Sequence, residues 1–211
     1  MNQQFLLRSV QPTSEYDKNY INFYDPLKAS YESHDEAEHR MKKYGYDYDR
    51  DLSNDETKVF YNPNQEDNKK LLVTFRGSKT LDDWTNTNPS ILLGGFTDTR
   101  RYKDSEHTLN QAKEKYSSNG ALLVGHSMGG SLSSALGKEN DTIYTFNKGA
   151  GSLFNHNTHN KSNEQAYRWT GDIISSGSIL NTIGSKIIGY NKNSYKKNHD
   201  LKNLKEYSIM L

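Results

Sequence analysis

Cysteine is absent from the 211 residues of this chain. Its absence excludes disulfide bonds, thiolate metal sites and a cysteine nucleophile, but it does not select a compartment, because disulfide-free folds occur everywhere. Long apolar runs are also missing. Phe5-Leu6-Leu7 is too short for the apolar part of a secretion signal, and no segment reaches the length of a membrane span. We therefore expect a soluble, cytoplasmic protein without a signal peptide or transmembrane segment.

Apolar residues and net charge are both scarce. Hydrophobic residues make up 32% of the chain and the mean hydropathy is -0.99, so we expect the fifteen tyrosines to supply part of the core. The 27 basic and 26 acidic residues leave a net charge of +1. Because nucleic-acid binding needs a concentrated basic face, we predict no nucleic-acid partner.

The first 56 residues are highly charged and rich in tyrosine, and they contain no obvious strand. Side chains spaced three and four residues apart predict one face of a helix that begins near Pro26 and ends at Gly45. These residues are Leu27, Tyr31, His34, Ala37, Met41 and Tyr44. We interpret residues 1–56 as a helical extension laid over a main domain at residues 57–211. A loosely held N-terminal arm is the alternative.

From residue 57 onward, short apolar runs alternate with helical patterns. The predicted strands are residues 59–61, 71–75, 121–124, 142–146 and, more weakly, 166–169. The predicted helices are residues 104–118 and 131–136. Strands that alternate with helices form βαβ units, so we predict an α/β fold with a mostly parallel sheet flanked by helices. The tail from residue 179 to 211 fits a strand or a helix equally well.

The strongest motif is Gly125-His126-Ser127-Met128-Gly129, which matches G-x-S-x-G between an apolar strand and a helix rich in small residues. In such a tight turn, side chains two positions before and after the serine would collide with the neighbouring backbone. The turn exposes the hydroxyl and directs the N–H groups of the helix start toward a reacting carbonyl. We predict Ser127 as a nucleophile and give His126 a packing role. A glycine-rich turn that merely contains serine is the alternative.

A nucleophilic serine needs a base, and the base needs an orienting carboxylate. The serine motif between a strand and a helix predicts an α/β-hydrolase fold, in which these residues follow the serine in the order acid, then histidine. This order favours His199, in a polar stretch near the end, and Asp172, just past a predicted strand. His156 and His159 also follow the serine, with Asp141 as their main acid, although Asp141 is typical of a turn. We interpret the two loop histidines as solvated rather than as metal ligands, and we predict no metal or cofactor.

Two blocks of the chain together resemble a known family. Residues 71–78 (LLVTFRGS), followed by Asp83-Trp84 and then by the serine motif at residues 125–130, are similar to the class 3 (fungal-type) lipases. The resemblance covers residues 58–200. The chain is shorter than a typical member, and its first 50 residues have no counterpart there. Its Asn-, Lys- and Tyr-rich character also resembles compact lipase-like proteins of large DNA viruses and their satellites. A viral origin would imply a particle-associated rather than a cytoplasmic protein.

The resemblance implies roles for several positions. The residue that matches Ser78 lends its N–H to the oxyanion hole, Met128 supplies a second N–H, and Asp172 matches the acid. The Asp-Trp pair lies beside the lid, and residues 79–82 are polar where an interfacial lipase has an apolar lid. A helix cap is the alternative role of Ser78.

A serine carboxylester hydrolase is the activity that the resemblance implies, with Ser127, His199 and Asp172 as the triad. The polar segment favours a phospholipid or a small soluble ester over bulk triglyceride, with transient contact to a membrane surface. Two alternatives stay open at this point. One is an acyltransferase or peptidase on the same fold, and the other is a lipase-like scaffold without activity.

Overall fold

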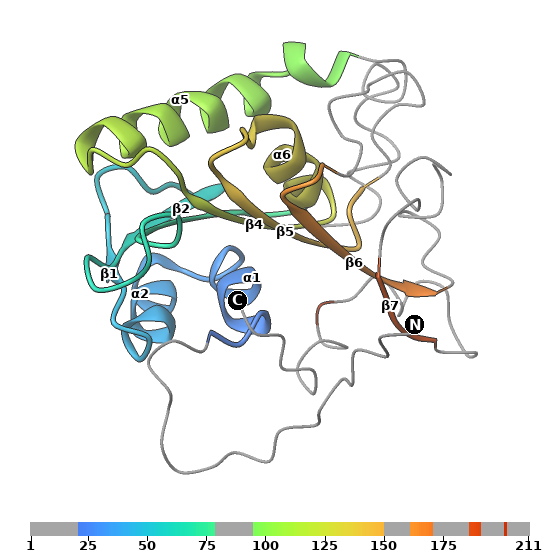
Figure 1. Cartoon of the computed structure of the whole chain (residues 1–211), viewed down its shortest axis with the longest axis horizontal. Coiled ribbons are helices and arrows are strands. Elements are labelled where there is room, and N and C mark those ends of the chain that lie inside the picture. The colour runs from blue at the N-terminus through green and yellow to red at the C-terminus, as the bar shows by residue number, and fades with distance from the viewer. Residues whose placement is uncertain (1–20, 79–94, 150–160, 171–185, 191–200, 202–211) are drawn as a thin grey trace.

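Helices cover both faces of a central sheet in the computed structural model, which describes residues 21–78, 95–149, 161–170, 186–190 and 201 (Figure 1). In these residues the sheet has seven strands that follow one another in chain order. The strands are β1 (Asp47–Tyr48), β2 (Thr57–Tyr61), β3 (Leu71–Phe75), β4 (Leu122–His126), β5 (Thr142–Phe146), β6 (Glu164–Thr170) and β7 (Lys186–Tyr190). Strands β1 to β3 are antiparallel, and β3 to β7 are parallel. The predicted α/β fold with a mostly parallel sheet is confirmed.

The central strands are apolar because both of their faces are covered. Every residue of β3 and β4 is buried, which explains their continuous apolar runs. Their register places Phe75 opposite Gly125, and the next pair of strands places His126 opposite Phe146. The carboxyl ends of β3, β4 and β5 therefore meet at one edge of the sheet, where parallel sheets usually build their sites.

Four α-helices and one short 3-10 helix are described, and the α-helices form two layers. Helices α5 (Arg100–Lys115) and α6 (Met128–Leu136) lie on one face, and α1 (Tyr24–Ala29) and α2 (His34–Lys42) lie on the other (Figure 1). The 3-10 helix η1 (Gly95–Asp98) precedes α5. Each layer has its own apolar cluster. On the α5 and α6 side, Leu109 and Leu132 pack with Val73 and Leu123. On the α1 and α2 side, Phe23, Leu27 and Met41 pack with Leu72 and Phe146.

The N-terminal region contains two helices where the sequence pattern predicts one. The prediction of a single helix from Pro26 to Gly45 is wrong, because α1 ends at Ala29 and Ser33 caps the start of a second helix. The Ser33 hydroxyl accepts the N–H of Glu36, and the Glu36 carboxylate accepts the N–H of Ser33. This capping box places Tyr31 between the helices rather than inside one. The predicted apolar face is nevertheless buried against the sheet at Leu27, Ala37, Met41 and Tyr44.

The N-terminal region also contributes to the sheet itself. Strand β1 pairs with β2, so residues before position 57 form one edge of the sheet as well as a helical layer. The division of the chain at residue 57 stays a prediction. In the ambiguous tail, residues 186–190 form strand β7, which pairs parallel to β6.

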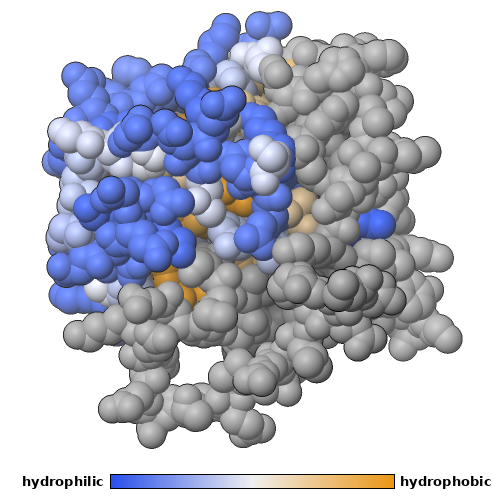
Figure 2. All heavy atoms as spheres, in the orientation of Figure 1, coloured by the Kyte–Doolittle hydropathy of each residue, from blue (hydrophilic) through white to orange (hydrophobic). Residues whose placement is uncertain are grey.

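Most of the described surface is hydrophilic in the view of Figure 2, with small apolar areas in its middle. This agrees with the low mean hydropathy of the chain. Among the helices within the described residues, none has both the length and the apolar character that crossing a membrane requires.

Candidate active site

Ser127 occupies a strained turn between β4 and α6. Its backbone has φ 57° and ψ -125°, a conformation that residues other than glycine rarely adopt. The Ser127 N–H donates to the Phe146 carbonyl at 3.1 Å, which holds the turn against the end of β5. Such strain costs about 1–3 kcal/mol and persists where the surrounding structure enforces it, often at functional sites. The turn has the conformation that a nucleophile elbow requires.

The glycines of the motif allow three backbone segments to meet. A Cβ at Gly125 would overlap the Gly129 carbonyl group, so strand and helix could not turn this sharply. A Cβ at Gly129 would lie 2.6 Å from the carbonyl carbon of Phe75, which is closer than real Cβ contacts. Side chains at these two positions would therefore collide with neighbouring backbone, as the sequence predicts. The backbone that they would meet belongs to β3 as well as to the turn itself.

The first turn of α6 is fixed from two sides. The Ser127 carbonyl accepts N–H groups from Gly130 at 3.0 Å, Ser131 at 3.2 Å and Gly149 at 2.8 Å. The Ser131 hydroxyl in turn donates to the Gly149 carbonyl at 2.9 Å. The loop after β5 is therefore tied to the elbow. Met128 begins the helix, so its N–H is among the four that have no acceptor within the helix.

The loop after β3 lies beside the elbow. A Cβ on Gly77 would lie 2.9 Å from the His126 carbonyl oxygen and 3.0 Å from Ser127 Cβ, so these backbones are in close contact. Ser78 follows directly and is partly buried. The arrangement brings the two predicted oxyanion positions, Ser78 and Met128, to the same edge of the sheet on neighbouring segments. Their roles as donors stay predictions.

Tyr31 is a residue of the site that sequence reasoning missed. Its hydroxyl oxygen accepts the Gly77 N–H at 2.9 Å and lies 2.7 Å from Nδ1 of His126. His126 is buried and its ring stacks on Phe146 at 5.7 Å between centroids, which agrees with the packing role expected for it. The sequence showed Tyr31 only as a member of an apolar helical face. Its contact with Gly77 spans 46 positions of the chain and had no local signal.

Comparison with known families gives a match to a Tle-like phospholipase domain over residues 16–189. The chain belongs to this phospholipase-like family. The match begins before α1, so it includes both N-terminal helices. No curated protein and no solved structure gives a match. The lipase-like character inferred from the sequence is confirmed, whereas the narrower resemblance to class 3 lipases and to viral proteins stays a prediction.

Asp141, the alternative acid, has a structural role in the phospholipase-like domain. It precedes β5, whereas Ser127 lies next to Phe146 at the other end of that strand, about 16 Å away for five extended residues. Its carboxylate accepts hydrogen bonds from the Lys113 ammonium at 2.6 Å and from the N–H groups of Ala121 and Lys138 at 2.8 Å. Asp141 therefore lies far from Ser127, and its carboxylate holds the turn before β5.

The other predicted site residues lie outside the described residues. They are Asp172, His199, His156 and His159, together with Asp83-Trp84 and the segment at residues 79–82. Asp172 and His199 thus stay predictions. Within the part of the chain that the structure describes, no group of three or more His, Asp or Glu side chains could hold a metal ion.

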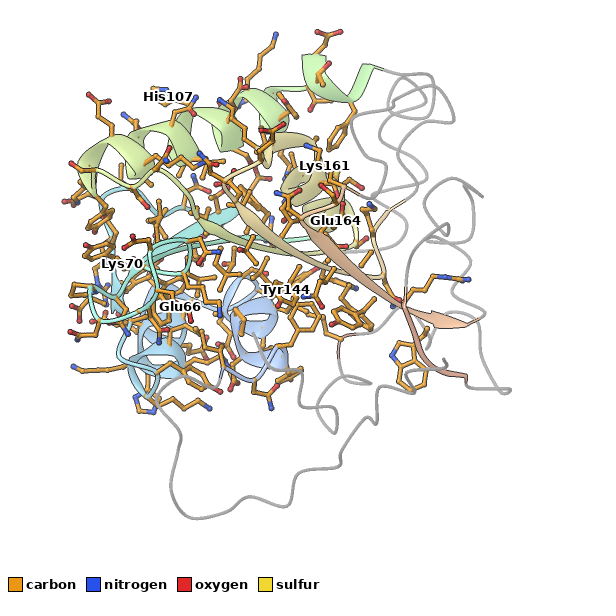
Figure 3. The ribbon with its side chains drawn as sticks, viewed as in Figure 1. Glu66, Lys70, His107, Tyr144, Lys161 and Glu164 are labelled. Atoms are coloured by element: carbon orange, nitrogen blue, oxygen red, sulfur yellow. The ribbon has the colours of Figure 1, made fainter. Side chains whose placement is uncertain are left out.

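A buried ion pair supports the loop after β5. Lys148 Nζ lies 2.8 Å from Glu164 Oε1, and both side chains are almost completely buried. The same carboxylate oxygen accepts the hydroxyls of Ser134 at 2.7 Å and Thr145 at 2.9 Å. In Figure 3, Glu164 lies on the α6 side of the sheet, and Tyr144 points to the α1 side. Burial lowers the pKa of Lys148, and the Glu164 carboxylate opposes this effect. The pair therefore fixes the segment that leads to Gly149 and the elbow.

Proposed function

We propose that the protein is a serine carboxylester hydrolase that acts on phospholipids. The conformation of Ser127 carries this proposal. A serine with φ 57° between a buried strand and a helix rich in small residues is the geometry of an acyl-transfer nucleophile, and it occurs here in a chain of a phospholipase-like family. Phospholipids carry carboxylic esters, so the family and the turn point to the same chemistry.

The reaction assigns one role to each residue. Ser127 Oγ attacks the ester carbonyl while His199 takes its proton, and Asp172 holds the tautomer of His199. The N–H groups of Ser78 and Met128 donate to the oxyanion. His199 then protonates the leaving alcohol, and water hydrolyses the acyl-enzyme by the same steps in reverse.

The surroundings of the elbow support this assignment. The α6 N-terminus lies beside the hydroxyl, so its unpaired N–H groups and helix dipole favour a developing negative charge. The contacts of Gly77, Gly129 and Gly149 bring three backbone segments around the same turn. Donors fixed in this way need no rearrangement during the reaction, and each is worth about 10²–10³-fold in rate.

The test combines an activity-based label with lipid hydrolysis by the full chain. We expect a fluorophosphonate probe to label the wild type and Ser127→Ala to abolish both labelling and release of fatty acid from phosphatidylcholine micelles. Ser133→Ala is the matched control. Its hydroxyl lies on the same helix and donates back to the Gly129 carbonyl at 3.0 Å, so its loss should leave labelling intact. Undiminished hydrolysis by folded Ser127→Ala would refute the assignment, and an unlabelled wild type would favour a scaffold without activity.

A further inference from the structure

Two arginines meet where β3 ends and α5 begins, and a lysine lies near Arg76 on the sheet face that α1 and α2 cover. Lys58 lies on β2, Arg76 directly follows β3, and Arg101 lies in the first turn of α5. Lys58 is 1% exposed and Arg76 is 9% exposed, and the Arg101 side chain is 14% exposed. The Arg101 guanidinium donates to the Arg76 carbonyl, which joins α5 to the end of β3. Burying three positive charges so close together is costly unless an anion balances them.

Glu56 supplies only part of that balance. Its Oε1 lies 3.9 Å from Arg76 Nη2 and 3.8 Å from Arg101 Nη1, and both distances exceed a hydrogen bond. The Glu56 side chain is 40% exposed, so solvent weakens its attraction further. One carboxylate thus lies between two guanidinium groups without forming the bidentate contact that arginine usually makes with it.

Several buried donors of the cluster have no partner. The Nζ of Lys58 and the Nε atoms of Arg76 and Arg101 are buried without a hydrogen bond, and so is the hydroxyl of Thr74, which pairs with Lys58 across the two strands. A buried donor left unpaired costs about 1–3 kcal/mol, and more if it is charged. Burial and the charge of Arg76 lower the pKa of Lys58, whereas the nearby Asp55 carboxylate raises it and so offsets part of this cost. Such a cluster lowers the stability of the fold on its own, and an anionic ligand would offset that cost.

The first turn of α5 adds to the same preference. It contains Arg100 and Arg101 and no acidic residue. Helix N-termini carry a partial positive charge, so basic residues there are unfavourable and an anion is favourable. The helix N-terminus and the guanidinium groups therefore both favour a negatively charged ligand.

The cluster lies next to the proposed oxyanion position. Arg76 precedes Ser78 by two residues, which limits the separation of their Cα atoms to about 7 Å. In a glycerophospholipid, the acyl ester and the phosphodiester are separated by only a few bonds of the glycerol. We propose that Arg76 and Arg101, with Lys58 behind them, bind the phosphodiester of the phospholipid substrate. This inference rests on the proposed function and assigns it a head-group subsite.

Two adjacent arginines of α5 allow a matched test. Arg101 is in the cluster, whereas the Arg100 side chain is 93% exposed and pairs with Asp104 one turn later. We expect Arg101→Gln to lower kcat/KM for dioleoylphosphatidylcholine about 10- to 100-fold, as for the loss of a charge-assisted hydrogen bond. The same variant should lower kcat/KM for dioleoylglycerol, measured in the same detergent micelles, by a clearly smaller factor, because that lipid has no phosphate and loses only the support that Arg101 gives to the Arg76 carbonyl. Arg100→Gln should leave both values unchanged.

A second variant separates ligand binding from architecture. Lys58→Met keeps the volume and removes an unpaired buried charge, so we expect a higher melting temperature together with a lower preference for phosphatidylcholine over dioleoylglycerol. A structural role for Lys58 would give a lower melting temperature and equal loss on both lipids. Either that result, or equal loss on both lipids in Arg101→Gln, would overturn the subsite.

Binding to the inactive Ser127→Ala protein tests the subsite without relying on turnover. Its binding to phosphatidylcholine micelles should exceed its binding to dioleoylglycerol micelles, and Arg101→Gln in that background should abolish the difference. If the wild type hydrolyses neither lipid but this binding difference holds, the proposed function fails and the subsite stands. If inorganic phosphate competes as effectively as phosphatidylcholine micelles, the site is one for free phosphate, and the head-group assignment is overturned.

Discussion

The hydroxyl of Tyr31 lies 2.7 Å from Nδ1 of His126, across 95 positions of the chain. The same oxygen accepts the Gly77 N–H, so its own proton is available to donate to His126. This arrangement satisfies both groups when the imidazole is neutral with its proton on Nε2. Tyr31 thus connects the N-terminal helices to strand β4 and to the loop that bears Ser78.

We expect Tyr31→Phe to reduce kcat about tenfold with little change in KM, because a looser Gly77–Ser78 loop weakens interactions made in the transition state. The variant leaves a buried N–H without its acceptor, which should cost about 1–3 kcal/mol of unfolding free energy. Hydrolysis of a p-nitrophenyl ester and urea denaturation measure the two effects.

Tyr48→Phe is the control for this prediction. The Tyr48 hydroxyl also lies close to a histidine Nδ1, at 2.8 Å from His34, but it contacts neither Gly77 nor the elbow. It should lose stability without losing kcat after correction for the folded fraction. If both tyrosine variants lower kcat equally, Tyr31 acts only through general stability and has no positioning role.

Local patterns predicted the sheet well because burial on both faces leaves a continuous apolar run. Strands β3 and β5 begin and end where the sequence places them, and the G-x-S-x-G turn lies between a strand and a helix as expected. The N-terminal helix was harder, because the residues of its apolar face stay buried even though the helix is interrupted. Ser33 and Glu36 carried a capping signal, but the longer periodic pattern concealed it.

Long-range contacts had no signal of this kind. The hydrogen bond from Gly77 to Tyr31 depends on how α1 packs against β3 and β4, and the ion pair of Lys148 with Glu164 depends on the register of β5 and β6. Neither follows from propensity or spacing. The candidate site could therefore be predicted at the turn of Ser127, which contains the motif, but not at the residues that support that turn.

The elbow glycines differ sharply in what they tolerate. At Gly129 a Cβ would meet the backbone of Phe75, which cannot move without shifting β3, whereas at Gly130 the nearest atom, the Gly125 carbonyl oxygen, lies 3.2 Å away. We expect Gly129→Ala to lose about 2–4 kcal/mol of unfolding free energy through overpacking. Gly130→Ala should change it by less than about 1 kcal/mol, because helix propensity offsets the tighter contact. Chemical denaturation of both variants measures the difference, and equal stability would show that β3 does not contact the elbow as closely as described.

The ion pair of Lys148 and Glu164 gives a prediction that depends on pH. Glu164→Gln leaves the Lys148 ammonium buried without its counter-ion, and breaking a buried pair in this way costs about 3–5 kcal/mol near neutral pH. Burial already lowers the pKa of Lys148 below its ordinary value of 10.5, and loss of the carboxylate lowers it further. The folded variant then releases a proton that the unfolded chain retains, so its stability rises with pH between the folded pKa and 10.5.

The deficit of Glu164→Gln relative to the wild type should therefore shrink as the pH is raised from 7 toward about 10. Urea denaturation of both proteins across this range measures it, and taking the difference cancels titrations that the two share. Lys70→Gln is the control, because Lys70 Nζ pairs with the exposed Asp67 at 2.7 Å and its loss leaves the Lys148–Glu164 pair intact. A deficit that stays constant or grows with pH would mean that Lys148 does not remain charged and buried in the variant. The cost of the substitution would then come from lost hydrogen bonds to Ser134 and Thr145 rather than from the unpaired ammonium.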